Sequence, residues 1–293
     1  MRGAFIKLHI SIVLAGMTGV LGKLIELAEG PLVLYRMFIT SILLVALLCV
    51  LRKPIRVQFA EARKLCVLGI LMGLHWVCFY GSIKYANVSI GVLCFSLTGF
   101  FTAILEPLLE RHKVLPRELF FSLISVLGIS LIFHLDTRYR TGISLGVCSS
   151  AFFSLFTIFN KRVTQTHHPL TILLYIMSTG FVALLCLSPI YMAYFPATVL
   201  KPTLSDIVYL LILSSVCTIV MLDLQLQALK SISAFTVNLS YNLEPVYSIA
   251  IAMAFLGEAN NLSLSFWAGL ALICLSVVLQ TLYALRQRPP KLC

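Results

Sequence analysis

Charged residues are scarce in this chain. Only 11% of its 293 residues are Asp, Glu, Lys or Arg, whereas 60% are apolar. A soluble domain is usually about one-quarter charged, so too few charges remain to cover a water-facing surface. Apolar stretches of about the 20 residues that a helix needs to cross hydrocarbon recur along the whole length. The composition therefore predicts an integral membrane protein.

Motifs of enzymes and metal sites are also missing. The chain has no HExxH, P-loop or GxSxG motif and no paired carboxylates flanking a loop. Its nine cysteines stand singly, without a CxxC pair or a His/Cys spacing suited to zinc. We therefore expect no enzyme activity, no metal and no cofactor. The missing P-loop also excludes an ATP-driven pump acting alone.

The apolar runs predict ten spans once they are split at charged or Gly/Pro-bearing breaks. The spans cover about residues 5–25, 31–51, 65–83, 88–109, 119–135, 142–160, 170–194, 205–228, 232–256 and 263–285. Only helices and closed barrels satisfy backbone polar groups in lipid, and these runs lack the strict alternation of barrel strands. The predicted fold class is an all-α integral membrane protein with ten transmembrane helices.

The net charge of +11 reports topology rather than a nucleic-acid partner, because the basic residues stand in short clusters between apolar runs. With a cytoplasmic N-terminus, 16 Lys and Arg residues fall on the cytoplasmic side and 5 on the other. This bias predicts a multi-pass protein of the cell membrane, inner or plasma, with both termini in the cytoplasm.

Sparse internal identities relate the two halves of the chain. An offset of 138 aligns Lys23 with Lys161, and an offset of 146 aligns Lys84 with Lys230 and Leu93 with Leu239. These matches map spans 1–5 onto spans 6–10. Because five is odd, the halves cross the membrane in opposite senses, as in many transporters. The sequence thus predicts two inverted five-helix repeats, residues 1–137 and 138–293.

Four segments resemble the EamA-type branch of the drug/metabolite transporter superfamily over residues 5–285. They are LAGMTGVLGK in span 1, PLVLYR opening span 2, YGSIKYANVSIGVL joining spans 3 and 4, and ALKSISAFTVNLSYNLEPVYSIAIAMAFLGE over spans 8 and 9. The last is similar to the family's ending of a half, here with Pro245, Gly257 and Glu258. Span 4 departs from that pattern, with Thr98 where the repeat places Glu244. The resemblance implies a secondary carrier with a central cavity between the halves.

Glu244 is the most informative single residue of the predicted spans. An ionised carboxylate inside a span is costly and usually faces a cavity, pairs with a base or carries protons. At helical spacing it shares a stripe with Asn238, Tyr241 and Ser248, and Pro245 removes a donor from the Tyr241 carbonyl. The stripe predicts a binding surface, and a structural hydrogen bond or ion pair of Glu244 is the alternative.

Further candidates lie on the other spans. Arg36 suits a carboxylate, that of Glu244 or of a substrate, or else reaches the headgroups. His75 is placed to relay protons or to bond a neighbouring helix. The remaining candidates are Trp76 and Tyr80 in span 3 and Phe95 and Thr98 in span 4.

We therefore expect a secondary transporter, and more specifically an exporter, of a small amphipathic metabolite such as an amino acid. It would work by alternating access with proton coupling or exchange. A cavity lined by spans 1, 3, 4, 6, 8 and 9 would hold the solute. The expected partners are that solute and the lipid bilayer, and a homodimer is compatible with the sequence. A membrane-embedded enzyme or a channel subunit is the alternative function.

Overall fold

The computed structural model describes residues 2–111, 113–132, 140–164, 168–194 and 199–248, residue 251, and scattered positions from 268 to 282. Throughout this part of the chain the regular structure is helical. The elements are α1 Arg2–Leu24, α2 Glu29–Val50, α3 Phe59–Tyr85, α4 Val88–Phe95, α5 Thr98–Glu110, α6 Pro116–Ile132, α7 Arg140–Val163, α8 Pro169–Tyr194, α9 Leu204–Ser214, the π-turn η2 Ser215–Val220, α10 Met221–Leu229, α11 Ala234–Ser240 and the 3-10 turn η3 Tyr241–Leu243.

Seven helical segments of the described chain are long and apolar enough to cross a membrane. One of them, Ile90–Glu110, joins α4 to α5, and another, Leu204–Leu229, joins α9, η2 and α10. The all-helical, membrane-spanning class is therefore confirmed. The number ten stays a prediction, since α6 has 17 residues and most of the predicted spans after Ser248, with Gly257 and Glu258, lies outside the described residues.

Hydrogen bonds between helix ends define the two ends of the bundle. At one end, which we call the N-side, Lys7 of α1 donates to Gln227 of α10 at 2.6 Å. At the opposite end, the far side, Lys84 of α3 donates to the Ile25 carbonyl just after α1 at 2.5 Å. The Tyr191 hydroxyl of α8 reaches Glu29 of α2 there, at 2.9 Å. Successive spans thus run in alternating directions.

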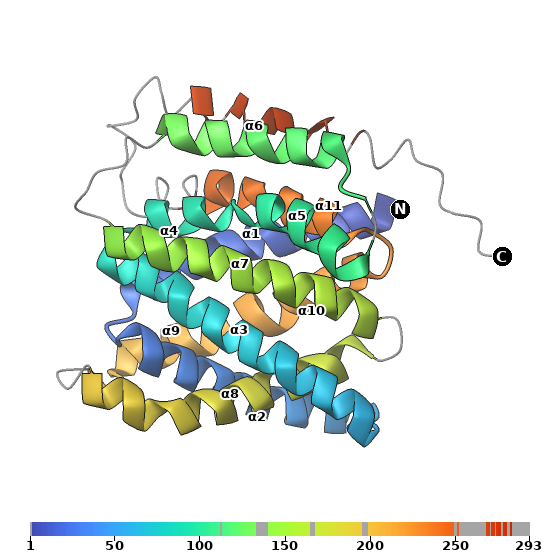
Figure 1. Ribbon diagram of the computed structural model, residues 1–293. Helices are drawn as coiled ribbons and strands as arrows, with labels where there is room; N and C mark the ends of the chain where they lie inside the picture. Colours follow the sequence, from blue (N-terminus) through green and yellow to red (C-terminus); the bar gives the residue numbers. More distant parts are fainter. Residues whose placement is uncertain are drawn as a thin grey trace.

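Helix α3 lies at the centre of the described bundle, as Figure 1 shows, with α7 on one side and the α2–α8 pair on the other. Its inward residues Leu68, Met72, Trp76, Phe79 and Ile83 are buried, which is a helical spacing of three to four residues. Helix α6 runs along the opposite edge of the bundle from α2 and α8. The centrally placed α3 therefore contributes to any site at the core.

Two helices begin and break at positions that are 146 residues apart. Asn87 caps α4 by accepting from the Ile90 N–H, and Ser233 caps α11 by accepting from the Thr236 N–H. The first helix is interrupted after Phe95, and the second passes into the turn η3 at Tyr241. The offset found in the sequence therefore recurs in local structure. The division into halves at residue 137 lies in a stretch outside the described residues.

Gly69 lets the backbones of α3 and α8 approach closely. A Cβ built on it would lie 2.6 Å from the Ile176 carbonyl oxygen and 2.8 Å from the Gly180 nitrogen. A Cβ built on Gly73, one turn further along, would meet only the Leu184 side chain, at 3.3 Å or more. Of the two glycines in this GxxxG motif, Gly69 is therefore the one that the packing requires.

We expect Gly69→Ala to destabilise the protein, because backbone atoms of α8 cannot move aside as a side chain can. Overpacking of this kind costs about 1–3 kcal/mol, which corresponds to a fall of roughly 3–10 °C in melting temperature. Thermal melting followed by fluorescence-detected size-exclusion chromatography measures it. Gly73→Ala is the matched control and should melt close to the wild type; equal losses in both variants would contradict the assignment.

Candidate functional site

A small enclosed cavity lies at the centre of the bundle. Its volume is about 30 Å³, room for about one water molecule. Side chains from α1, α2, α3, α4, α7, α10 and the turn after α11 line it: Ala15, Thr18, Arg36, Met72, His75, Trp76, Phe79, Phe95, Phe153, Met221, Leu222, Tyr241 and Glu244. These are the six predicted spans together with span 2. We call this space the central cavity.

Arg36 lies wholly inside the bundle and does not extend to the headgroups. Its side chain is 0% exposed. The guanidinium donates to the Thr218 hydroxyl at 2.9 Å, the Tyr80 hydroxyl at 2.6 Å and the Cys217 carbonyl at 3.0 Å, and it lies 3.7 Å over the Trp76 ring. These bonds use three of its five N–H donors. Two donors therefore remain for a ligand.

A π-turn supplies two of the three acceptors of Arg36. The turn η2, Ser215–Val220, interrupts the span between α9 and α10, and π-turns inside helices are frequent at functional sites. The Thr218 hydroxyl donates to the Leu213 carbonyl at 2.7 Å, five residues back, while the Cys217 carbonyl faces Arg36. The Ser214 hydroxyl in turn donates to the Arg36 backbone carbonyl at 3.2 Å. The local widening of the helix thus holds Arg36 in place.

Glu244 is also buried, at 3% exposure, and lines the central cavity. The structure describes no hydrogen bond or ion pair of its carboxylate, and none joins it to Arg36. The expectation of a free Tyr241 carbonyl is wrong, because the Glu244 N–H donates to it. The 3-10 turn replaces the bond that Pro245 cannot make.

The predicted stripe of α11 and the turn η3 does not face one space. Tyr241 lines the central cavity, and its hydroxyl pairs with that of Ser11 at 2.8 Å. Asn238 donates to the Thr102 hydroxyl of α5 at 2.7 Å, and Ser248 donates to the Gly16 carbonyl of α1 at 2.8 Å. Asn238 and Ser248 therefore hold helices together in this conformation.

Aromatic rings make up much of the cavity wall. Phe95 lies 4.9 Å from Phe153 and 5.2 Å from His75, between ring centroids. His75 pairs with the Ser149 hydroxyl at 2.8 Å, which fits its predicted role of bonding a neighbouring helix. Thr98 lies beside the cavity, where its hydroxyl donates to the Phe95 carbonyl. The cavity thus has one aromatic wall between Arg36 and Glu244.

Several cavity residues escaped the sequence analysis. They are Ala15, Thr18, Met72, Phe79, Phe153, Met221 and Leu222. In sequence these look like any other apolar or small residues of a span, and only helix rotation decides that they face inward. The one available signal was the polar run Ser214, Ser215, Thr218 within an otherwise apolar span, which marks the holder of Arg36.

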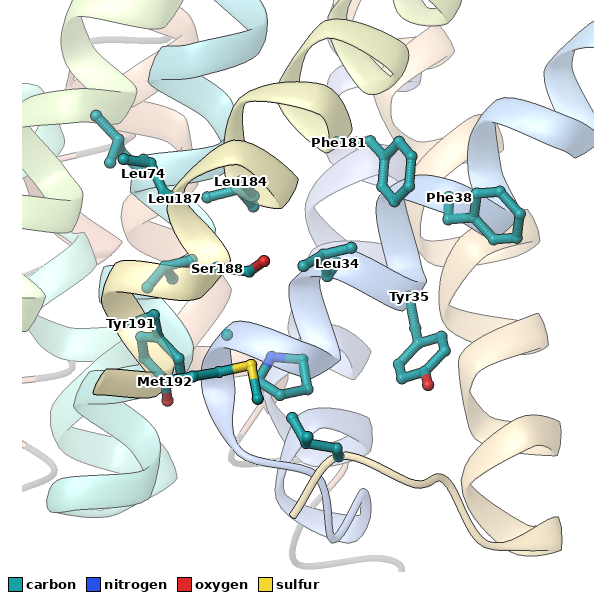
Figure 2. Close-up of a pocket in the computed structure, with 14 residues that line it drawn as sticks. Leu34, Tyr35, Phe38, Leu74, Phe181, Leu184, Leu187, Ser188, Tyr191 and Met192 are labelled. Carbon is teal, nitrogen blue, oxygen red and sulfur yellow. The ribbon is translucent and has the colours of Figure 1, made fainter. Parts of the chain in front are cut away.

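A larger cavity of about 520 Å³ lies between α2 and α8 on the far side. Figure 2 shows Leu34 and Phe38 of α2 facing Phe181, Leu184 and other apolar residues of α8. Phe38 is 45% exposed on the bundle surface, so this groove opens toward lipid. No Asp, Glu, Lys or Arg lines it. The groove offers apolar contact only, and the ionisable chemistry lies in the central cavity.

Comparison with known proteins agrees with this arrangement. The EamA-like transporter family matches the chain twice, over residues 3–134 and 140–282. The chain belongs to the EamA-like transporter family. A chain in a crystal structure is similar to it with a TM-score of 0.75 and 15% identity, covering 98% of this chain and 99% of that chain. At that identity the likeness shows the fold alone. None of the curated proteins matches the chain.

Membership in the EamA-like transporter family confirms two predictions from the sequence. The protein is a multi-pass membrane protein of the drug/metabolite transporter type. Its family consists of transporters rather than enzymes. The partners that follow from this are a small-molecule solute and the lipid bilayer.

Proposed function

We propose that this EamA-like transporter carries a small amphipathic solute that bears a carboxylate, such as an amino acid, through the central cavity. The observation that carries this proposal is the pair of buried, oppositely charged residue types, Arg36 and Glu244, lining one cavity without bonding to each other. A buried charge without a counter-charge is costly. A zwitterionic solute placed between them would supply both counter-charges.

The aromatic wall supports an amphipathic solute over a sugar phosphate. Phe79, Phe95, Phe153 and Trp76 surround the space between the two charged residues. Such rings favour an apolar or aromatic body, while the two free N–H donors of Arg36 suit a carboxylate. A polyhydroxylated solute would leave its hydroxyl groups without partners there.

Alternating access of two inverted halves, residues 1–137 and 138–293, is the mechanism we propose, with export as its direction. The caps and breaks that recur 146 residues apart support related halves. Glu244 would take a proton in one conformation or bind the amine of the solute, giving proton coupling or exchange. Residence in the cell membrane with both termini in the cytoplasm, and a homodimeric assembly, stay predictions.

Counterflow in proteoliposomes tests the proposed solute class. Liposomes containing the purified protein are loaded with an amino acid and exposed to the labelled form, over a panel of aromatic and aliphatic amino acids. For those transported, we expect the corresponding methyl ester and the decarboxylated amine to compete at least tenfold more weakly, because neither offers a carboxylate to Arg36. Equal competition by acid and amine would contradict the proposal, as would counterflow no faster than in protein-free liposomes across the panel.

A further inference from the structure

Three buried side-chain amides on the N-side of the central cavity have unpaired polar atoms. Within the described residues no partner is found for Oδ1 of Asn160, Oδ1 of Asn238, or either polar atom of the Gln225 amide. All three side chains are at most 1% exposed. Buried polar atoms are nearly always hydrogen-bonded. Each of these amides therefore calls for an explanation.

The three amides continue the cavity-facing stripes of their helices. Asn160 follows Phe153 of the cavity wall by seven residues along α7, which is two turns. Gln225 follows Met221 by four residues along α10, and Asn238 precedes Tyr241 by three along α11. Residues at these spacings share a helix face. The amides therefore lie below the cavity, toward the N-side.

The amides also share one depth in the bundle. Asn160 lies three residues before the end of α7, Gln225 four before the end of α10, and Asn238 four after the start of α11. At 1.5 Å per residue this is about 5–6 Å inside the N-side ends. Helix α11 packs against both α7 and α10. The three groups thus form a layer between the central cavity and the N-side.

Polar bridges close the N-side over this layer. The Lys7 ammonium of α1 donates to Gln227, whose amide donates to Asp223 at 2.6 Å. The Lys161 ammonium of α7 donates to the Leu229 and Ile232 carbonyls at the end of α10. These bridges involve exposed or half-buried groups, which water can replace at little cost. Separation of α1 and α7 from α10 would open the layer to water.

We propose that Asn160, Gln225 and Asn238 form a second polar subsite, which binds the hydrogen-bonding groups of the solute between the central cavity and the N-side. This inference rests on the proposed transport function. The amides offer both donors and acceptors, as the carboxylate and amine of a zwitterion require. The matching position of α3 offers only Leu65 and Leu68, both buried and apolar, so the subsite belongs to the α7, α10 and α11 side of the path.

Cysteine labelling tests whether this layer meets water from the N-side. Single cysteines replace Gln225 or Asn160 in a chain otherwise free of cysteine, and a membrane-impermeant maleimide is added to sealed right-side-out or inverted vesicles. We expect labelling only in vesicles that present the N-side, at least tenfold faster for Gln225→Cys than for Leu226→Cys. Leu226 is the matched control, equally buried on another face of α10.

Two outcomes would overturn the subsite. One is labelling of Leu226→Cys as fast as Gln225→Cys, which indicates general loosening, and the other is no labelling of either amide position. Gln225→Met gives a second measurement that does not depend on labelling. Without partners, the amide adds no stability, so this variant should melt at or above the wild-type temperature; a fall of several degrees would show that Gln225 is structural. None of these readouts needs solute flux, so they fail independently of the transport assay.

Discussion

Replacing Arg36 by Met is expected to raise the KM for a carboxylate-bearing solute about 100-fold. Removing one partner of a buried, hydrogen-bonded charge pair costs about 2–5 kcal/mol, and 1.4 kcal/mol is a factor of ten. Arg36 is buried, keeps two donors free and lines the central cavity. Counterflow in proteoliposomes at varied solute concentration measures the change.

Matched variants separate binding of the solute from folding. Arg36→Lys keeps the charge but loses the planar fork, and we expect a smaller rise in KM, about tenfold. Tyr80→Phe removes one acceptor of the guanidinium, 2.6 Å away, and leaves the charge in place. A monodisperse Arg36→Met protein with unchanged KM would show that Arg36 only holds α2 against the π-turn.

Replacing Glu244 by Gln is expected to abolish solute accumulation driven by a pH gradient, a loss of at least tenfold, while counterflow without a gradient stays within about threefold. The amide has the shape of the acid but cannot take or release a proton. Glu244 has no described partner that the change would disrupt. Labelled solute in liposomes with an imposed pH gradient measures accumulation.

Glu29→Gln is the matched control for this second prediction. Glu29 is buried too, at 7% exposure, but it bonds Tyr191 on the far side and does not line the central cavity. We expect full pH-driven accumulation in that variant. Full pH-driven accumulation in Glu244→Gln would remove the proton role, and loss of counterflow as well would assign Glu244 to binding of the solute amine.

Much of the fold could be predicted because lipid restricts the choices. Apolar runs near 20 residues must be helices, since no other single segment satisfies its backbone there. Helices of the described chain fall where span predictions put them, for example α3 over 65–83 and α8 over 170–194. Interruptions were less predictable: the break after Phe95 and the π-turn at Ser215 carry no proline.

The candidate site was half accessible from the sequence. Arg36 and Glu244 were found because charged residues are rare in apolar spans and therefore conspicuous. Asn238 and Ser248 were grouped with Glu244 by spacing, yet they bond to α5 and α1. The shift into a 3-10 turn at Tyr241 changes the rotation per residue, so a stripe drawn at α-helical spacing separates there.

By itself, then, the sequence determined that this protein lies in a membrane, that its spans are helices, and that a few buried ionisable residues carry its chemistry. Hydrocarbon imposes all three, because it rejects open backbone and unpaired charge. Only the tertiary structure decided that Arg36 and Glu244 share a cavity without touching, that a π-turn holds the first, and that three unpaired amides lie on the N-side. These facts depend on helix rotation and packing between segments up to about 200 residues apart, which local periodicity does not encode.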